Sequence, residues 1–310
     1  MKKLKVALLS GGISSEREVS IKSGNQVYEA LDKNKYDIFK YDPKTDINKL
    51  VEEAKTIDVA LILLHGTYGE DGTIQGLLDL LGVPYQGAGV LGSSISMNKL
   101  VAKRLYEQAG LKIPAYRLCR PNQEINYDEI IEYLGFPIVV KPVEGGSSIG
   151  MSIVKSKDLL KIAIEQAFNY DDFVLLEEYI KGIEITGSVL GNNENVQALP
   201  IIEIVPDKFH DFFDYEAKYT PGATQEICPA RISQSHTKKA QEYAVLAHKT
   251  LFCKVYSRTD MILKDDEIYI LETNTIPGMT PNSLFPIAAK TAGMSFSELL
   301  DKLIELSIQS

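Results

Sequence analysis

The sequence is poor in cysteine and has no tryptophan. Its three cysteines, Cys119, Cys228 and Cys253, are far apart and form no C-x-x-C pair. A sparse, odd set of cysteines argues against a disulfide framework and favours reduced thiols in a cytoplasmic protein. The four histidines also lack the H-E-x-x-H spacing of a zinc hydrolase, and there is no G-x-S-x-G motif. Neither zinc catalysis nor a covalent protein nucleophile is therefore expected.

Long hydrophobic runs are also lacking. The longest, residues 59–64, is far below the ~20 residues that a membrane-spanning helix needs. The apolar run at residues 6–9 is too short for the hydrophobic region of a signal peptide, and it is better interpreted as a first buried strand. We therefore expect a protein with no membrane partner.

Positive charge is in the minority. The 310 residues include 33 Lys and Arg against 42 Asp and Glu, a formal net charge of −9. A protein that grips nucleic acid usually has net positive charge or a basic stripe, and neither is evident, so nucleic acid is not an expected partner. An anionic small molecule is still compatible with this charge if a few cations converge in one cleft.

What is present is an ordinary globular composition, with 45% hydrophobic residues, 22 glycines and 13 prolines. At roughly 100–200 residues per domain, the length predicts two or three domains. In the first ninety residues, buried strands at 5–9 and 59–64 alternate with helical patterns at 16–31 and 73–81. This alternation is typical of an α/β unit with a parallel sheet covered on both faces.

The rest of the chain changes character near residue 181, after which strands with short connections dominate and an α+β arrangement is expected. We place domain limits at 1–95, 96–180 and 181–310. The predicted helices are residues 96–110, 159–167, 237–251 and 297–308. The predicted strands are residues 138–140, 149–154, 173–176, 183–190, 196–204, 258–263 and 267–271.

The last two of these strands carry the most telling spacing. Arg258 and Asp260 lie two residues apart, as do Glu272 and Asn274, so each pair shares one face of its strand. If the connecting loop is odd in length, or if a bulge shifts the register, Asp260 lies opposite Glu272 and all four converge. Two carboxylates and an amide oxygen are ligands that suit Mg²⁺. The alternative is a solvated hairpin, which the strongly apolar neighbouring residues disfavour.

A glycine-rich loop follows the strand that ends in Lys141. Gly145 and Gly146 allow close backbone approach to phosphate oxygens, and Ser147 and Ser148 add hydroxyl groups. The loop is not a Walker A motif, because the G-x-x-x-x-G-K-[ST] pattern is absent. A phosphate site and a flexible hairpin tip are both compatible with this pattern.

An apolar strand at residues 173–176 is followed by Glu177, Glu178 and, further on, Glu184. Such an edge can hydrogen-bond an adenine through its backbone while a carboxylate holds the ribose hydroxyls. The alternative is an acidic strand end on the surface.

Residues 87–92 satisfy the G-x-G-x-x-G pattern of dinucleotide-binding proteins. That fingerprint needs a buried strand before it, and residues 83–85 make a poor one. An NAD-dependent enzyme is thus a weak alternative. The segment is better interpreted as a loop entering the helix that carries Lys99, a candidate phosphate contact.

Four further stretches, in this order, are specific: GGISSEREVS at 11–20, HGTYGEDGTIQG at 65–76, DYEAKY at 214–219 and ETNTIPGMT at 272–280, followed by Ser283 and Leu284. Together with the lysine and glycine-loop segments, they resemble the D-alanine–D-alanine ligases of the ATP-grasp superfamily over nearly the whole chain. The resemblance implies a three-domain ATP-grasp architecture in which the central and C-terminal domains sandwich ATP. It implies ATP-dependent ligation of two D-alanine molecules through a D-alanyl phosphate, for peptidoglycan synthesis.

The resemblance also implies roles for individual residues. ATP would be bound by Lys99, Lys141, Gly146, Ser148, Glu177, Glu184 and Lys218. Two Mg²⁺ ions, for which Mn²⁺ can substitute, would be bound by Asp260, Glu272 and Asn274. The first substrate would be held by Glu16 and His65, the second by Ser283 and Leu284. Arg258 and the Gly278 backbone N–H would stabilise the oxyanion, while Ser147 and Tyr219 would hydrogen-bond with Glu16 and close a lid.

Tyr219 bears on the choice of the second substrate. Relatives that make the D-alanine–D-lactate ester tend to have Phe at this position, so the resemblance favours an amine acceptor. Asn98 stands before Lys99 where relatives often have Asp, a harmless change. The resemblance further implies a homodimer. Two alternatives stay open: a ligase with another acceptor such as D-serine, and a non-catalytic ATP-binding module. Such a module should have lost a metal ligand or the oxyanion arginine, and this chain keeps both.

Overall fold

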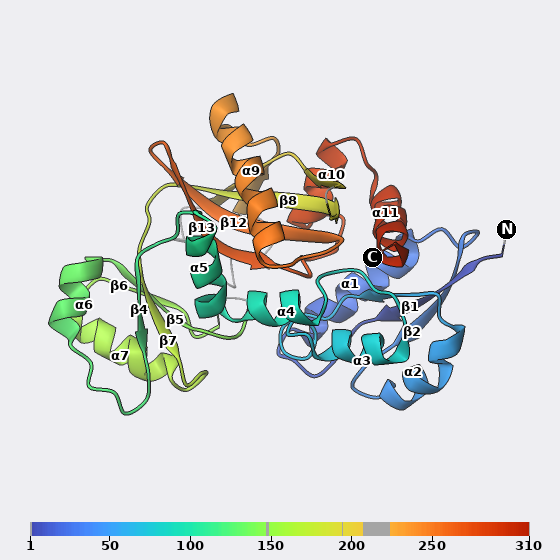
Figure 1. Cartoon of the computed structure of the whole chain (residues 1–310), viewed down its shortest axis with the longest axis horizontal. Helices are drawn as coiled ribbons and strands as arrows, with labels where there is room; N and C mark the ends of the chain where they lie inside the picture. The colour runs from blue at the N-terminus through green and yellow to red at the C-terminus, as the bar shows by residue number, and fades with distance from the viewer. Residues whose placement is uncertain (1, 147–148, 194, 207–223, 310) are drawn as a thin grey trace.

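The computed structural model shows a chain folded around three separate β-sheets (Figure 1). It describes residues 2–146, 149–193, 195–206 and 224–309. The first sheet lies at one end of the molecule, the second at the other, and the third between them (Figure 1). The mixed α/β class expected from the sequence is confirmed.

The N-terminal sheet has the order β2-β1-β3 and is parallel throughout, as the strand–helix alternation predicts. Its central strand β1 is buried over its last four residues, which explains why the hydrophobic run signalled it. The edge strand β2 was not predicted, because most of its side chains are exposed or half-buried and it lacks an apolar run. The elements here are β1 (Leu4–Leu9), α1 (Arg17–Ala30), β2 (Tyr36–Tyr41), α2 (Ile47–Glu53), a 3₁₀ turn (Ala54–Thr56), β3 (Val59–Ile62) and α3 (Thr73–Leu81).

The central sheet is antiparallel with the order β4-β7-β5-β6, and its two faces differ in chemistry. Side chains of a strand alternate between faces. Ile138 and Val140 therefore share the apolar face that packs against helices α6 and α7, whereas Lys141 points to the opposite face. The elements are β4 (Tyr116–Cys119), α6 (Tyr127–Leu134), β5 (Ile138–Pro142), β6 (Ser152–Val154), α7 (Lys157–Ala167) and β7 (Val174–Glu178).

The C-terminal sheet has the order β11-β10-β8-β12-β13, with β9 paired to β8. The single strand predicted at 196–204 is wrong, because it is two strands. Leu199 still bonds to β8, but the register with β8 shifts by one residue across Pro200, which has no N–H to donate. The elements are β8 (Ile183–Asn192), β9 (Asn195–Ala198), β10 (Ile202–Pro206), β11 (Thr224–Ile227), α9 (Gln234–Thr250), β12 (Tyr256–Lys264) and β13 (Glu267–Asn274).

The helix predicted at 96–110 is also divided, into α4 (Val90–Met97) and α5 (Lys99–Gln108). Asn98 breaks it with φ −90° and ψ 99°, and its side chain caps α5 by accepting the Val101 N–H at 3.0 Å. Tyr106 and Ala102 of α5 pack in the core of the C-terminal sheet, so this helix joins a sheet that lies far along the chain. The three-domain division stays a prediction.

The carboxyl end of the chain returns to the first sheet. Helices α10 (Leu284–Thr291) and α11 (Phe296–Ile308) share one hydrophobic core with Val6 and Leu8 of β1. Lys35 and Tyr36 both contact the Asp301 carboxylate of α11, at 2.6 and 2.7 Å. Figure 1 shows α11 beside β1 and α1, with both chain ends at the same side of the molecule. The N-terminal unit is therefore completed by the last helices.

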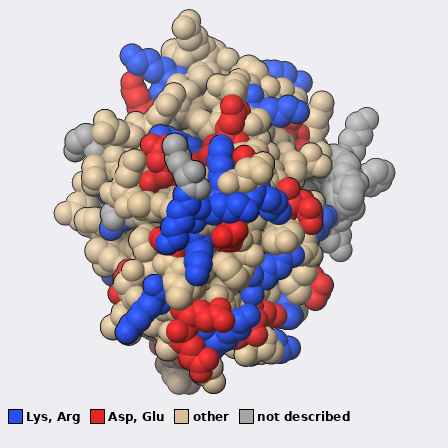
Figure 2. Space-filling view, turned by 90° about the vertical axis from the view of Figure 1, so that its right-hand side faces the viewer, with Lys and Arg blue, Asp and Glu red and all other residues tan. Residues whose placement is uncertain are grey.

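Charge is distributed unevenly over the surface. Figure 2 shows the face at the N-terminal end, where Lys and Arg side chains form a band across the middle with acidic side chains around it. Ion pairs in this unit, such as Lys3 with Asp37 at 3.5 Å, offset part of the charge locally.

In the described part of the chain, no helix is both long and apolar enough to cross a membrane.

Leu303→Ala tests whether α11 closes the N-terminal core. The Leu303 side chain is only 1% exposed and belongs to the same hydrophobic core as residues of β1. The substitution should therefore destabilise the protein by about 2–5 kcal/mol through lost contacts and a residual cavity. Urea unfolding followed by circular dichroism measures this loss. Ile308→Ala is the control, because Ile308 is 44% exposed on the same helix and should change stability by about 0.5 kcal/mol or less. Equal effects of the two variants would contradict the packing.

Candidate active site

The sequence predicts that Asp260 lies opposite Glu272 if a bulge shifts the register of the last hairpin. The hairpin of β12 and β13 contains such a bulge. The register shifts between Asp260 and Met261, and this places Asp260 opposite Glu272 and Arg258 opposite Asn274. Residues directly opposite each other in an antiparallel pair share one face. The four polar side chains therefore converge on one face, and this prediction is confirmed.

The Asp260 carboxylate is the most heavily bonded group of this cluster. Arg258 donates to it twice, from Nε at 2.9 Å and from NH2 at 2.8 Å. Thr186 of β8 donates from Oγ1 at 2.6 Å, and Asn274 donates from Nδ2 at 3.1 Å. Arg258 and Asp260 are 9% and 7% exposed, so the paired fork fixes both side chains in place. Thr186 was not singled out in the sequence because it lies inside a strand without a motif.

Two cavities meet at this hairpin. One has a volume of about 590 Å³ and the other about 500 Å³. Four residues line both: Lys99, Gly145, Gly146 and Glu272. Groups held in the two cavities can therefore meet beside the Glu272 carboxylate, between two glycines and a lysine.

The larger cavity, which we call the substrate cavity, gathers the residues expected to bind substrate. His65 is among them, 7% exposed, and its Nε2 has no hydrogen-bond partner among the described residues. Burial lowers the pKa of His65, with the nearby Arg258 guanidinium acting in the same direction and Glu16 opposing it. The imidazole is therefore neutral at pH 7, and its Nε2 atom is buried without a hydrogen bond in the described structure. The predicted residues that line this cavity are Glu16, His65, Lys99, Gly146, Arg258, Glu272, Asn274, Gly278, Ser283 and Leu284.

Glu16 lies where the loop that contains Ser14 contacts the loop that contains His65. The Ser14 hydroxyl donates to the His65 carbonyl at 2.7 Å and ties the two loops together. Gly66 has φ +69°, and a Cβ atom added there would lie 2.9 Å from Glu16 Oε2, so glycine serves both backbone conformation and space. A Cβ atom added at Gly146 would lie 3.4 Å from Glu16 Oε2. The glycine loop of the central unit therefore reaches the Glu16 carboxylate.

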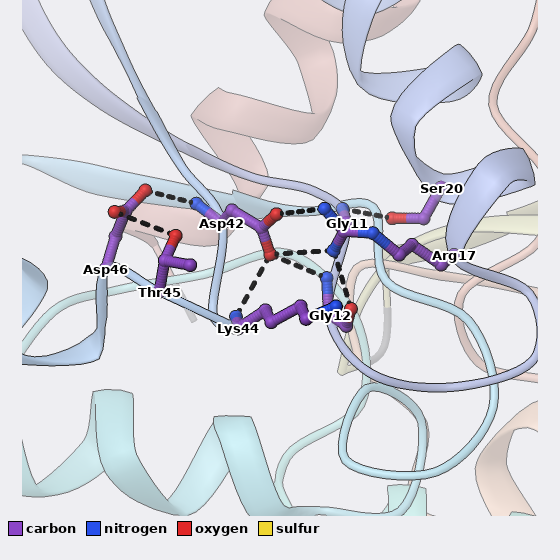
Figure 3. A network of polar contacts seen from close by, with 8 residues as sticks. All are labelled: Gly11, Gly12, Arg17, Ser20, Asp42, Lys44, Thr45 and Asp46. Atoms are coloured by element: carbon purple, nitrogen blue, oxygen red, sulfur yellow. Dashed lines mark hydrogen bonds and ion pairs between the residues drawn. The ribbon is translucent and has the colours of Figure 1, made fainter.

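A second network anchors the loop before α1 (Figure 3). Arg17 donates to both Asp42 oxygens, at 3.1 and 2.6 Å, and to the Gly12 carbonyl at 2.7 Å. Asp42 in turn accepts the Gly12 N–H at 2.9 Å. Although burial opposes its charge, the Arg17 guanidinium and the backbone N–H donors lower the pKa of Asp42 to about 2. This network, which the sequence did not predict, fixes the residue next to Glu16.

The far side of the substrate cavity is the start of helix α10. Ser283 is the N-cap residue, so Leu284 contributes a backbone N–H at the positive end of the helix. The Ser283 hydroxyl lies 2.8 Å from Thr280 Oγ1 and accepts the Thr280 N–H at 3.1 Å. This arrangement suits a carboxylate ligand.

The smaller cavity, which we call the nucleotide cavity, lies between the central and C-terminal sheets. Lys99 donates to the Gly145 carbonyl at 2.6 Å, and Asn98 donates to Glu144 at 2.9 Å. The start of α5 is thereby fastened to the glycine loop. The predicted residues that line this cavity are Lys99, Lys141, Gly146, Glu177, Glu184, Asp260 and Glu272.

The Glu177 carboxylate is occupied by two lysines. Lys103 contacts one oxygen at 2.9 Å and Lys141 the other at 3.0 Å. Burial opposes the charge of Glu177, but the two ammonium groups outweigh it and lower the pKa of Glu177. Lys103 was missed in the sequence, because a lysine inside a helix usually faces solvent.

Four predicted residues lie outside the described part of the chain: Ser147, Ser148, Lys218 and Tyr219. The stretch 214–219 lies there as well. Their roles in the phosphate loop and the lid stay predictions.

Residues 87–92 line neither cavity in the described structure. A Cβ atom added at Gly92 would lie 2.8 Å from the Phe252 carbonyl oxygen, so this glycine lets α4 pack against the end of α9.

The two buried cysteines are poor nucleophiles. Burial raises the pKa of Cys119 to about 11 and that of Cys253 to about 12, which keeps both protonated at neutral pH.

Glu70 is a site residue that sequence reasoning missed. It lines the substrate cavity and accepts the Gly66 N–H at 2.7 Å. Desolvation, followed by repulsion from Glu16, raises the pKa of Glu70 to about 8. It lies in the specific stretch 65–76, but a motif alone does not show that a glutamate faces a second carboxylate.

Glu70→Gln should remove part of the pH dependence of stability. The native carboxyl ionises near pH 8 and the unfolded one near 4.5, so the wild type loses stability as pH rises between these values. The variant should therefore equal the wild type at pH 4 and exceed it at pH 8.5, because the amide still accepts from Gly66. Urea unfolding of the ligand-free protein at both pH values measures this, with Glu52→Gln as an exposed control. A variant less stable at pH 8.5 would contradict the assignment.

Known proteins resemble nearly the whole chain. The family model described as D-ala D-ala ligase C-terminus matches residues 105–305, and the model described as D-ala D-ala ligase N-terminus matches residues 5–48 and 40–88. The chain is 59% identical over 307 residues to a D-alanine–D-alanine ligase of Syntrophobacter fumaroxidans, covering 99% of this chain and 98% of that protein. It is 48% identical to a D-alanine–D-alanine ligase of Desulfotalea psychrophila, over 99% and 96% of the two chains.

Solved structures also closely resemble the fold of this chain. A D-alanine–D-alanine ligase from Bacillus anthracis complexed with ATP superposes with a TM-score of 0.86 at 40% identity, covering 99% of this chain and 98% of that one. The VanG D-Ala:D-Ser ligase from Enterococcus faecalis superposes with a TM-score of 0.85 at 35% identity, covering 99% and 100%. The similarity extends through all three sheets.

Proposed function

The chain belongs to the D-alanine–D-alanine ligase family, and we propose on that premise that it joins two D-alanine molecules to D-alanyl-D-alanine at the expense of ATP. The product serves peptidoglycan synthesis and so the cell wall. The observation that carries the proposal is the meeting of the nucleotide and substrate cavities at Lys99, Gly145, Gly146 and Glu272. A phosphoryl group can pass there from ATP to a bound carboxylate.

The reaction has two steps. The carboxylate of the first D-alanine attacks the γ-phosphorus of ATP, which gives D-alanyl phosphate and ADP. The amine of the second D-alanine then attacks the acyl carbon, and the resulting tetrahedral intermediate expels phosphate to leave the peptide bond. Lys99 and Lys141 line the nucleotide cavity and supply positive charge where a carboxylate must approach a triphosphate.

The donor set on the hairpin fits Mg²⁺. Asp260, Glu272 and Asn274 offer hard oxygen ligands on one face. The set holds two carboxylates and one amide, and the described residues include no group of three or more His, Cys, Asp or Glu side chains that could hold a metal ion. We assign two Mg²⁺ ions, replaceable by Mn²⁺, to these three residues, where they would neutralise charge on the transferring phosphoryl group. Arg258 offsets the charge of Asp260 through two hydrogen bonds.

The first D-alanine lies in the substrate cavity in this proposal. The Glu16 carboxylate pairs with its ammonium group, and the neutral His65 imidazole contacts it. Arg258 and the Gly278 N–H stabilise the oxyanion in this proposal, which is supported by both residues lining the same cavity as Glu16. Ser147 and Tyr219 would complete the lid, as the family resemblance implies, and exclude water from the acyl phosphate.

The second D-alanine is held through its carboxylate at the start of α10. The Leu284 N–H and the Ser283 hydroxyl provide donors at the positive end of the helix. D-Serine as acceptor is not favoured, because relatives named as D-alanine–D-alanine ligases reach 59% identity, against 35% for the D-Ala:D-Ser ligase structure.

The proposal includes a cytoplasmic homodimer with domains at 1–95, 96–180 and 181–310. The three free cysteines, two of them buried, suit a reducing compartment. The family resemblance supports the dimer, and sedimentation velocity of the purified protein measures it.

Phosphate release tests the activity directly. With Mg²⁺ and ATP, D-alanine should give rapid phosphate release and a dipeptide detectable by mass spectrometry. L-Alanine and D-lactate should give little release, and D-serine should be a poorer acceptor than D-alanine. Failure to form D-alanyl-D-alanine, or release that is faster with D-serine, would contradict the proposal.

Arg258→Ala should separate chemistry from nucleotide binding. Loss of one oxyanion donor costs about 10²–10³ in kcat, whereas the nucleotide cavity keeps its lysines, so the Kd for ATP should stay within about threefold. Steady-state kinetics and calorimetric ATP titration measure the two quantities. Arg120→Ala is the control, because this exposed arginine lies outside both cavities. Unchanged turnover in Arg258→Ala would refute the oxyanion role.

A further inference from the structure

Three charged side chains are buried together beneath the nucleotide cavity. The side chains of Lys103, Glu177 and Lys141 are 1%, 3% and 10% exposed. The Glu177 carboxylate lies between the two ammonium groups, with one oxygen 2.9 Å from Lys103 Nζ and the other 3.0 Å from Lys141 Nζ. Buried charges are costly unless they are compensated, so this triad is a deliberate feature of the fold.

The two lysines reach Glu177 from different sides. Lys141 on β5 and Glu177 on β7 point to the same face of the central sheet, because Val139 is opposite Glu177 and Lys141 follows two residues later. Both line the nucleotide cavity. Lys103 comes from α5, which packs on the C-terminal sheet, and it is not among the residues that line the cavity. It therefore contacts Glu177 from behind.

The triad holds two positive charges and one negative charge. Burial lowers the pKa of Lys103 and Glu177 opposes that effect, while Lys103 and Lys141 together lower the pKa of Glu177. Within the described residues the Lys103 ammonium meets this carboxylate and, at 5.7 Å, the face of the Tyr116 ring. Among the described residues, an ionised Glu177 without Lys103 would have Lys141 as its only ion-pair partner.

We propose that Lys103 is a positioning residue for ATP binding, which neutralises Glu177 from behind so that the Lys141 ammonium is free to turn to a phosphate of the nucleotide. The inference rests on the proposed function, because it takes the cavity above Lys141 as the ATP site. Lys103 does not touch the nucleotide. It acts through Glu177 and decides how strongly that carboxylate retains Lys141.

Removing Lys103 should leave Lys141 locked to Glu177. In a site with little water, an ion pair at 3.0 Å is much stronger than at the surface. Lys103→Met keeps the length of the side chain and removes its charge, so the Kd and the KM for ATP should each rise about tenfold. The KM for D-alanine should stay within about twofold, because Lys103 is not among the residues that line the substrate cavity.

A comparison of ATP with adenosine distinguishes this mechanism from a structural effect. Lys141 would meet a phosphate, so Lys103→Met should weaken ATP binding while the affinity for adenosine stays within about threefold of the wild type. A merely structural role of Lys103 would weaken the binding of both ligands equally. Ile164→Val, a core change on α7 of the same unit, is the control and should leave ATP binding unaltered.

Calorimetric titration of the whole enzyme with ATP is the decisive measurement, with urea unfolding to show that each variant is folded. Wild-type ATP affinity in Lys103→Met, or an equal loss of affinity for ATP and for adenosine, would overturn the inference. If Lys103→Met does not fold, Lys103→Gln takes its place, because it also removes the charge but keeps a polar side chain beside the Glu177 carboxylate. Absence of ATP binding by the wild type would instead overturn the proposed function.

Discussion

The register of the β12–β13 hairpin is the constraint on which the site depends. One bulge between Asp260 and Met261 brings Asp260 opposite Glu272 and Arg258 opposite Asn274. A shift of one residue would turn an entire strand over and send its polar side chains into the apolar core. The cost of burying those groups holds the register, so the same energy that stabilises the sheet also assembles the metal ligands and the oxyanion arginine.

Three carboxylates at or near the two cavities are compensated by specific cationic partners. Asp260 is held by Arg258, Asp42 by Arg17, and Glu177 by two lysines. Each of these pairs offsets its charge locally. A ligase that must bring a carboxylate to a triphosphate needs cations that can change partners, and paired lysines and arginines provide them without a net positive surface.

The arrangement of the units explains why the site lies at their junction. Helix α5 packs on the C-terminal sheet while its start is fastened to the glycine loop of the central unit. Helices α10 and α11 return to the N-terminal sheet, and the start of α10 faces Glu16 across the substrate cavity. Residues of all three units thus line the two cavities.

The sequence by itself determined whatever depends on local pattern. Alternation of strands and helices predicted the parallel first sheet, residues two apart predicted the shared faces of the hairpin, and four specific stretches indicated the family. Its failures were also local in cause: β2 lacks an apolar run, Asn98 caps a new helix inside an apparent single one, and Pro200 divides a strand.

Only the tertiary structure decided which charges meet. The pairing of Lys103 with Glu177, the repulsion between Glu70 and Glu16, and the docking of α11 beside β1 join residues far apart in the chain. Periodicity and propensity carry no information on such contacts, because they describe neighbours along the backbone. Burial, which sets the strength of every one of these interactions, exists only once the sheets have packed.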